Sequence, residues 1–96
     1  MIIKLVEIYK NSSYEQQRYS LREIFLNSEH IVCLRPEPRY EKMLKEGYLP
    51  EGIDSRQEFT RVFMDRGHLG MDIVVVGSPE IVEKKVHSNK RKILKG

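Results

Sequence analysis

MDIVVVGSPEIVEKKV, residues 71–86, decides the fold, because it joins a strand-like run directly to a helix-like run. Residues 71–76 are dense in Val and Ile and contain no residue that breaks a strand. Gly77 and Ser78 then interrupt the run, and a helical pattern begins at the next residue. We therefore predict a strand over residues 71–76 that leads straight into a helix.

The start of that helix is marked by the order of its residues. Ser78 can accept a hydrogen bond from a free amide in the first turn, and Pro79 suits the first helical position. Acidic residues come first and basic residues last, as the helix dipole prefers. We predict a helix from Pro79 to about Val86, after which Ser88 and Asn89 loosen the chain. Three residues are expected to face the sheet: Ile81, Val82 and Val86.

Further strands are predicted before this unit. Residues 2–9 alternate with apolar side chains on both faces, which is typical of a central strand, and the polar residues 10–17 predict a loop. Residues 19–26 and 30–35 are two apolar runs around the short polar turn Asn27–Ser28, and we predict a hairpin. A helix over 19–26 is the alternative, because some of its apolar residues also have helical spacing.

The middle of the chain is predicted to be an insertion. Pro36 and Pro38 end the preceding strand, and residues 39–46 predict a short helix with Gly47 just past its end. Residues 55–66 permit two interpretations. Ser55 and Glu58 have the spacing of a capping box before a helix, whereas the aromatic and β-branched residues favour a strand and a hairpin loop. We favour the strand.

These elements predict an α+β fold. Four or five antiparallel strands form a small sheet, the C-terminal helix covers one face, and a short helix lies in the insertion near 39–46. Residues 1–86 are expected to be one domain, and residues 87–96 a basic, flexible tail. The expected core consists of Ile3, Leu5, Ile24, Leu26, Ile31, Cys33, Ile73, Val75 and Ile81.

Composition limits the class of protein. The 96 residues are 40% hydrophobic and 32% charged, which is typical of a soluble globular domain. No apolar run approaches the roughly 20 residues of a membrane span. The N-terminus does not read as a signal peptide, and one cysteine, Cys33, permits no internal disulfide. We expect a cytoplasmic protein that does not associate with membranes, and Cys33 as a buried small hydrophobe.

The charge is divided unevenly along the chain. Residues 1–83 hold 11 Lys or Arg and 14 Asp or Glu, whereas residues 84–96 hold six basic residues and no acid. Such a segment can neutralise phosphates without reading sequence. We predict a small regulatory or adaptor protein that binds nucleic acid, or a machine associated with nucleic acid, through this tail. The expected contacts are Lys84, Lys85, Lys90, Arg91, Lys92 and Lys95. A solvated basic end is the plain alternative.

Other surfaces offer alternatives. An exposed sheet edge and the 38–57 insertion could bind a protein partner or a second copy of the chain. Four arginines lie near three tyrosines in the sequence and could form a base-stacking platform, or be ordinary surface residues. These are Arg18, Arg22, Arg35, Arg39, Tyr14, Tyr19 and Tyr40.

Catalytic signals are weak. His68 lies between Asp65 and Asp72 in a loop that could form a catalytic dyad or seat a cation, although Asp, Gly and His are also ordinary loop residues. The sequence contains no phosphate-binding or nucleophile-elbow motif, and the histidines fit no short metal motif. We expect no enzymatic activity, no cofactor and no metal.

Two stretches carry a resemblance to a known family. LREIFLNSEHIVCLRPE, residues 21–37, resembles the strand, turn and strand that open the small FlbD-like flagellar proteins. MDIVVVGSPEIVEKKV resembles their closing strand and the helix that begins at a serine. The resemblance covers about a third of the chain. It implies a small β-rich domain with a C-terminal helix and brings no catalytic residues.

Overall fold

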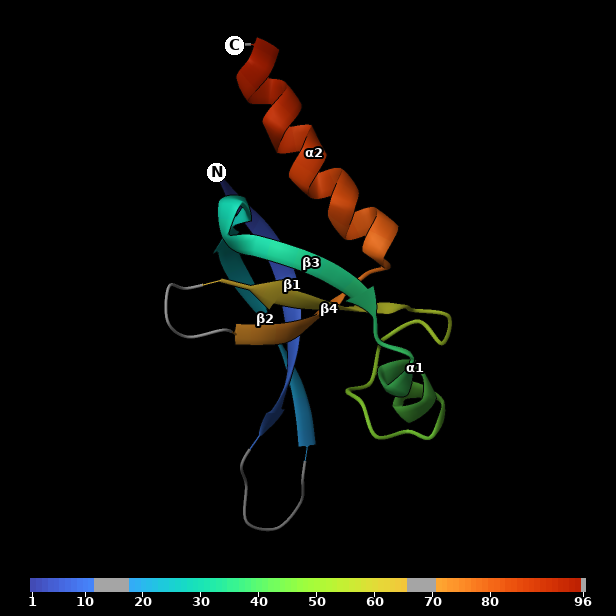
Figure 1. The fold of residues 1–96 in the computed structure, drawn as a ribbon. Helices are drawn as coiled ribbons and strands as arrows, with labels where there is room; N and C mark the ends of the chain where they lie inside the picture. The colour runs from blue at the N-terminus through green and yellow to red at the C-terminus, as the bar shows by residue number, and fades with distance from the viewer. Residues whose placement is uncertain (12–17, 66–70, 96) are drawn as a thin grey trace.

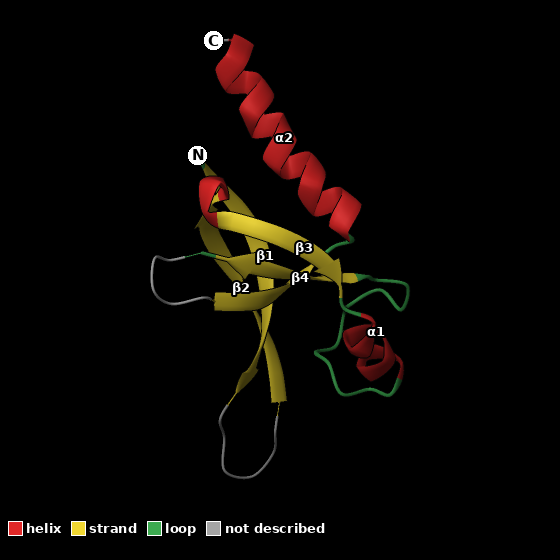
Figure 2. Ribbon diagram, viewed as in Figure 1, coloured by secondary structure: helices red, strands yellow, loops and turns green. Residues whose placement is uncertain are grey.

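The computed structural model describes residues 1–11, 18–65 and 71–95. Five antiparallel strands form one sheet in the order β2-β1-β5-β4-β3 (Figure 1). In the described residues, two α-helices and one short 3-10 helix accompany the sheet, and the fold is of the predicted α+β class (Figure 2). The strands are β1 Ile2–Asn11, β2 Arg18–Asn27, β3 Ile31–Pro36, β4 Phe59–Met64 and β5 Met71–Val76. The helices are η1 Ser28–His30, α1 Pro38–Lys45 and α2 Pro79–Lys95.

The central position of β1 explains why it is apolar on both faces. It lies between β2 and β5, so its backbone pairs on both sides. Ile3 and Leu5 belong to one buried cluster, and Ile8 belongs to another on the opposite face. The prediction of a central strand over residues 2–9 is confirmed, and the strand runs two residues further, to Asn11.

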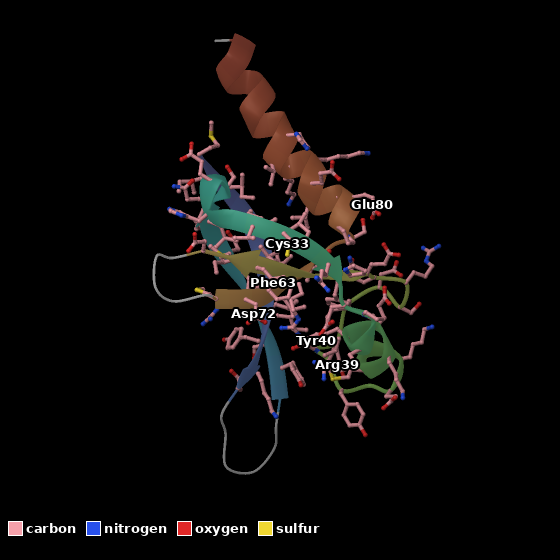
Figure 3. The ribbon with its side chains drawn as sticks, viewed as in Figure 1. Cys33, Arg39, Tyr40, Phe63, Asp72 and Glu80 are labelled. Carbon is pink, nitrogen blue, oxygen red and sulfur yellow. The ribbon has the colours of Figure 1, made fainter. Side chains whose placement is uncertain are left out.

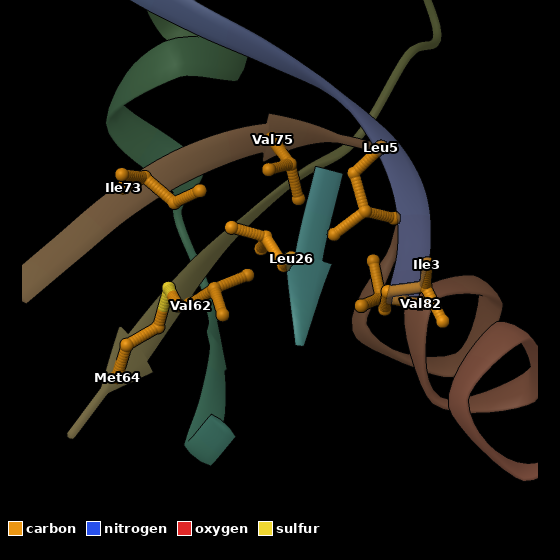
Figure 4. Packing of buried hydrophobic residues seen from close by; sticks show 8 residues of the cluster. All are labelled: Ile3, Leu5, Leu26, Val62, Met64, Ile73, Val75 and Val82. Carbon is orange, nitrogen blue, oxygen red and sulfur yellow. The ribbon is translucent and has the colours of Figure 1, made fainter. Parts of the chain in front are cut away.

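The main core lies on the face of the sheet that α2 covers. The sheet is coiled, so that Leu26 of edge strand β2 packs with residues of β4 and β5 (Figure 4). Val82 closes this cluster from the helix side and has no exposed surface. The eight buried members are Ile3, Leu5, Leu26, Val62, Met64, Ile73, Val75 and Val82. Burying this apolar face holds α2 on the sheet.

A second core lies between the opposite face of the sheet and the insertion that follows β3. Phe59, Val74 and Ile8 form its sheet side, and Leu49 is its buried residue from the insertion. Tyr40, on α1, packs against this cluster at a ring-centroid distance of 5.9 Å from Phe59. The two-turn helix α1 is therefore stabilised by tertiary packing, as its length requires.

The predicted hairpin of residues 19–26 and 30–35 is wrong. Both segments are strands, but β2 and β3 lie at opposite edges of the sheet and do not pair. The turn between them is the 3-10 helix η1, where Asn27 accepts a hydrogen bond from the Glu29 amide at 3.0 Å. The two neighbouring apolar runs have the local pattern of a hairpin. In the sheet, however, β2 pairs with β1 and β3 pairs with β4.

A β-bulge in β3 overturns the expected burial of Cys33. The pairing with β4 shifts between Ile31 and Cys33, so that Ile31 and Leu34 pack against the main core and Cys33 is exposed. A bulge adds one residue to a strand and reverses the faces that follow it. Of the other expected core residues, Ile24 and Ile31 are partly buried, and Ile81 is half-exposed.

The insertion and β4 agree with the sequence. The helix expected over 39–46 is α1, and Gly47 follows it with a φ of 83°, a conformation that favours glycine. In the 55–66 stretch the favoured strand is confirmed as β4, and Ser55 and Glu58 precede it without a helix. Most of the loop predicted over 10–17, and residues 66–70 of the second hairpin loop, lie outside the described residues.

The helix α2 begins as predicted and ends much later. The Ile81 amide donates to Ser78 Oγ at 3.3 Å, which confirms the serine cap, and Pro79 is the first helical residue. The prediction that the helix ends near Val86 is wrong, because α2 continues to Lys95. Its C-terminal half extends away from the sheet (Figure 1). Ser88 and Asn89 are weak helix formers, but neither breaks a helix that has already nucleated.

Candidate nucleic-acid interface

The first two residues of the predicted basic site lie on the described part of α2. Lys84 and Lys85 are both exposed to solvent. The Lys85 ammonium lies over the sheet, where it donates to the backbone carbonyl of Lys4 at 3.5 Å. The exposed Lys84 can present its charge to a partner. These two positions therefore belong to the part of α2 that packs against the sheet through Val82 and Val86.

The other four residues of the predicted site belong to the same helix. Lys90, Arg91, Lys92 and Lys95 have helical backbone, and their side chains lie outside the described part of the chain. The 3.6-residue repeat brings positions 84, 91 and 95 onto one stripe, and positions 85 and 92 next to it. Position 90 falls on the far side of the helix. The backbone register therefore groups five of the six basic positions.

The predicted stacking platform does not form as one surface. Tyr19 and Tyr40 do meet, edge to face, with ring centroids 5.7 Å apart. Together with Arg39 they line a shallow hollow beside α1. Figure 3 labels Arg39 and Tyr40 on this helix. Burial raises the pKa of Tyr40. The side chains of Tyr14 and Arg18 lie outside the described residues.

The remaining two arginines of that prediction have other partners. Arg22 donates to the buried Glu7 carboxylate at 2.7 Å and lies 4.1 Å from the centre of the Tyr9 ring. Arg35 lies over Phe63 at 5.9 Å. Alternation along β2 puts Arg22 on the face opposite Tyr19. Arg35 shares the face of the tyrosine pair but lies over Phe63, so Tyr19, Tyr40 and Arg39 are the members of the predicted platform that line one hollow.

A charged cluster that sequence reasoning missed ties the insertion to the sheet. Arg61 of β4 donates to Glu37, which precedes α1, at 2.5 Å, and also to Asp72 of β5. The hydrogen bond from Arg61 holds the pKa of Glu37 below its usual value. Hydrogen bonding to Glu37 likewise raises the pKa of Arg61. Glu37 is far from both partners in the sequence, so no local motif could have indicated this cluster.

Of the alternative catalytic loop, the two aspartates lie within the described residues. Asp72 pairs with Arg61, and Asp65 is exposed, with its backbone amide donating to the His30 carbonyl at 2.8 Å. His68 lies outside the described residues. Over residues 1–11, 18–65 and 71–95, no group of His, Cys, Asp and Glu is placed to hold a metal ion. In the same ranges, no helix has the length and apolar character that crossing a membrane requires.

An apolar surface lies on β1 and β2, on the face opposite the main core. Phe25 is 64% exposed, Ile2 is 58% exposed and Leu21 is 39% exposed. The register places Lys4 opposite Phe25 and Ile8 opposite Leu21, so these side chains are neighbours on one face. Large exposed apolar side chains gathered in one place are typical of a protein-binding surface.

Comparison with known families, with curated proteins and with solved structures gives no match. The resemblance to the FlbD-like flagellar proteins therefore stays a prediction.

Proposed function

We propose that this protein is a non-enzymatic regulatory or adaptor module that binds nucleic acid through the basic stripe of α2. The observation that supports the proposal is the continuation of α2 to Lys95. A continuous helix holds positions 84, 91 and 95 in line, with 85 and 92 beside them. A fixed row of cations loses less conformational entropy on binding phosphates than a free tail does.

The charge of the rest of the chain favours contact through the helix alone. Residues 1–83 carry a net charge of −3, so this part of the chain repels a polyanion while residues 84–96 attract it. Contacts of this kind go to the phosphate backbone, and their strength falls steeply with salt. The proposed ligand is thus the phosphate backbone of DNA or RNA, without base recognition.

The helical register supplies a sharp test by fluorescence anisotropy with labelled single- and double-stranded DNA and RNA. The variant Arg91→Gln/Lys95→Gln removes two charges from the stripe, and Lys42→Gln/Lys45→Gln removes two exposed charges from α1 as a matched control. We expect only the first variant to lose affinity. Its plot of log affinity against log salt should be shallower by about 0.7–0.9 for each phosphate that the variant no longer neutralises.

Two single variants distinguish a helical stripe from a flexible basic end. Lys90→Gln removes one charge from the far side of the helix, and Lys95→Gln removes one from the stripe. We expect Lys95→Gln to weaken binding more. Equal losses would contradict the helical stripe, and unchanged affinity in Arg91→Gln/Lys95→Gln would refute the proposal as a whole.

Protein binding is the second candidate function, and the exposed side chains of Ile2, Leu21 and Phe25 favour it. The insertion is the less suitable surface, because its apolar side chains, Leu49 among them, pack inward against β4 and β5. Its exposed apolar residue is Tyr48. The sheet edge beside Phe25 is therefore the place to search for a partner.

A further inference from the structure

The two edges of the sheet differ in how open they are to another strand. The edge strand β3 has six residues, contains a bulge and ends at Pro36. Short length, bulges and proline are the devices by which proteins block edge pairing. The other edge strand, β2, has ten residues that pair with β1 in unbroken register and contains no proline. Its outer side is the edge suited to receive another strand.

On the face of β2 that points away from the main core, the pattern of apolar side chains is symmetric about Glu23. Ile24 and Leu26 point to the main core, so Leu21, Glu23 and Phe25 share the opposite face. Leu21 and Phe25 each lie two residues from Glu23, and both are exposed. A strand that carries apolar residues at equal distances on either side of a centre is complementary to its own antiparallel copy.

We propose that β2 pairs antiparallel with β2 of a second copy of this chain, about a two-fold axis at Glu23. This inference deepens the second candidate function by naming the partner. In this register each Phe25 lies opposite Leu21 of the other copy, twice in the dimer, and such cross-strand apolar pairs stabilise a sheet. If the register were shifted by two residues in either direction, Leu21 or Phe25 would lie opposite Glu23. That residue would then have no apolar partner across the dimer.

The charges at the axis are compatible with this pairing. Glu23 meets Glu23 of the second copy, and two carboxylates directly opposite each other are destabilising. However, Lys4 Nζ lies 3.7 Å from Glu23 Oε2 on the neighbouring strand. The dimer therefore has two diagonal Lys4–Glu23 ion pairs about its centre, with no net charge. An unrelated strand would have no reason to match this symmetry.

The first test measures molar mass by light scattering from micromolar to millimolar protein. We expect a mass that rises toward about twice 11.4 kDa. Phe25→Ser should stay monomeric, and Val32→Ser, which changes a residue 66% exposed on the other edge strand, should leave the dimer intact. Both residues are exposed, so both variants should fold, which circular dichroism and urea midpoints verify.

The second test determines the register between the two β2 strands by disulfide trapping in a Cys33→Ser background. Residue 23 lies opposite itself in the proposed dimer, so Glu23→Cys should form a covalent dimer under mild oxidant. Leu21→Cys should not, because residue 21 lies opposite residue 25. Efficient trapping of Leu21→Cys alone would overturn the register.

Loss of the dimer in Val32→Ser but not in Phe25→Ser would overturn the choice of edge, and a monomeric mass at every concentration would overturn the dimer. The second candidate function has its own separate readout, which is capture of a different protein that depends on Phe25.

Discussion

Val82 and Ile81 are adjacent on α2, and their different burial allows a test of how the helix sits on the sheet. The sequence predicts that both face the sheet. In the structure Val82 is fully buried in the main core, whereas Ile81 is 51% exposed. We expect Val82→Ala to destabilise the protein clearly more than Ile81→Ala does, although the isoleucine substitution removes more carbon atoms.

The expected magnitudes follow from burial. Val82→Ala removes two buried methyl groups, which costs about 1.6 kcal/mol in transfer free energy and about 1 kcal/mol more for the cavity that remains. Ile81→Ala removes three carbon groups at a half-exposed site without a closed cavity, which costs about 1.2 kcal/mol. Each change regains about 0.5 kcal/mol because alanine is the better helix former. The net losses are then about 2 kcal/mol for Val82→Ala and under about 1 kcal/mol for Ile81→Ala.

Urea denaturation followed by far-ultraviolet circular dichroism measures both free energies of unfolding. The slope with denaturant should be the same in the two variants, so that the midpoints report stability alone. The helix propensity gain is common to both and largely cancels in their difference. Equal losses, or a larger loss for Ile81→Ala, would show that α2 packs on the sheet through a different face and would refute this account of the core.

Two further predictions concern polar contacts that position the insertion and α2. Glu37→Gln should lower stability at neutral pH and flatten its dependence on acid pH, measured as urea midpoints from neutral to acid pH. The pKa of Glu37 is lowered in the folded state by the hydrogen bond from Arg61. Its contribution is therefore present above the usual glutamate pKa and is lost as the pH falls through the lowered value; an equally steep acid transition in the variant would contradict this. Thr60→Val should cost about 1–3 kcal/mol in thermal or urea unfolding, because the fully buried Thr60 hydroxyl donates to the Gly77 carbonyl at 2.7 Å and its removal leaves that bond unmade. A neutral effect would show that the carbonyl finds another partner.

The sequence by itself determined the elements whose signals are local. The structure confirms four local predictions. They are the strand over 71–76, the serine cap and proline at the start of α2, the short helix before Gly47, and the central strand at the N-terminus. In each case the signal is a property of a few consecutive residues: side-chain alternation, a cap or a fixed backbone angle. The concentration of basic charge after residue 83 is likewise visible in the sequence alone.

The tertiary structure decided which strands are neighbours and which side chains are exposed. Pairing depends on competition among all the strands, so the local hairpin pattern of 19–35 lost to partners distant in the sequence. One additional residue in β3 turned Cys33 outward, and rotation of α2 on the sheet exposed Ile81. The cluster of Arg61, Glu37 and Asp72 joins three segments through ion pairs that no periodicity encodes. Local patterns fix what a segment becomes, and only the packed sheet fixes what that segment contacts.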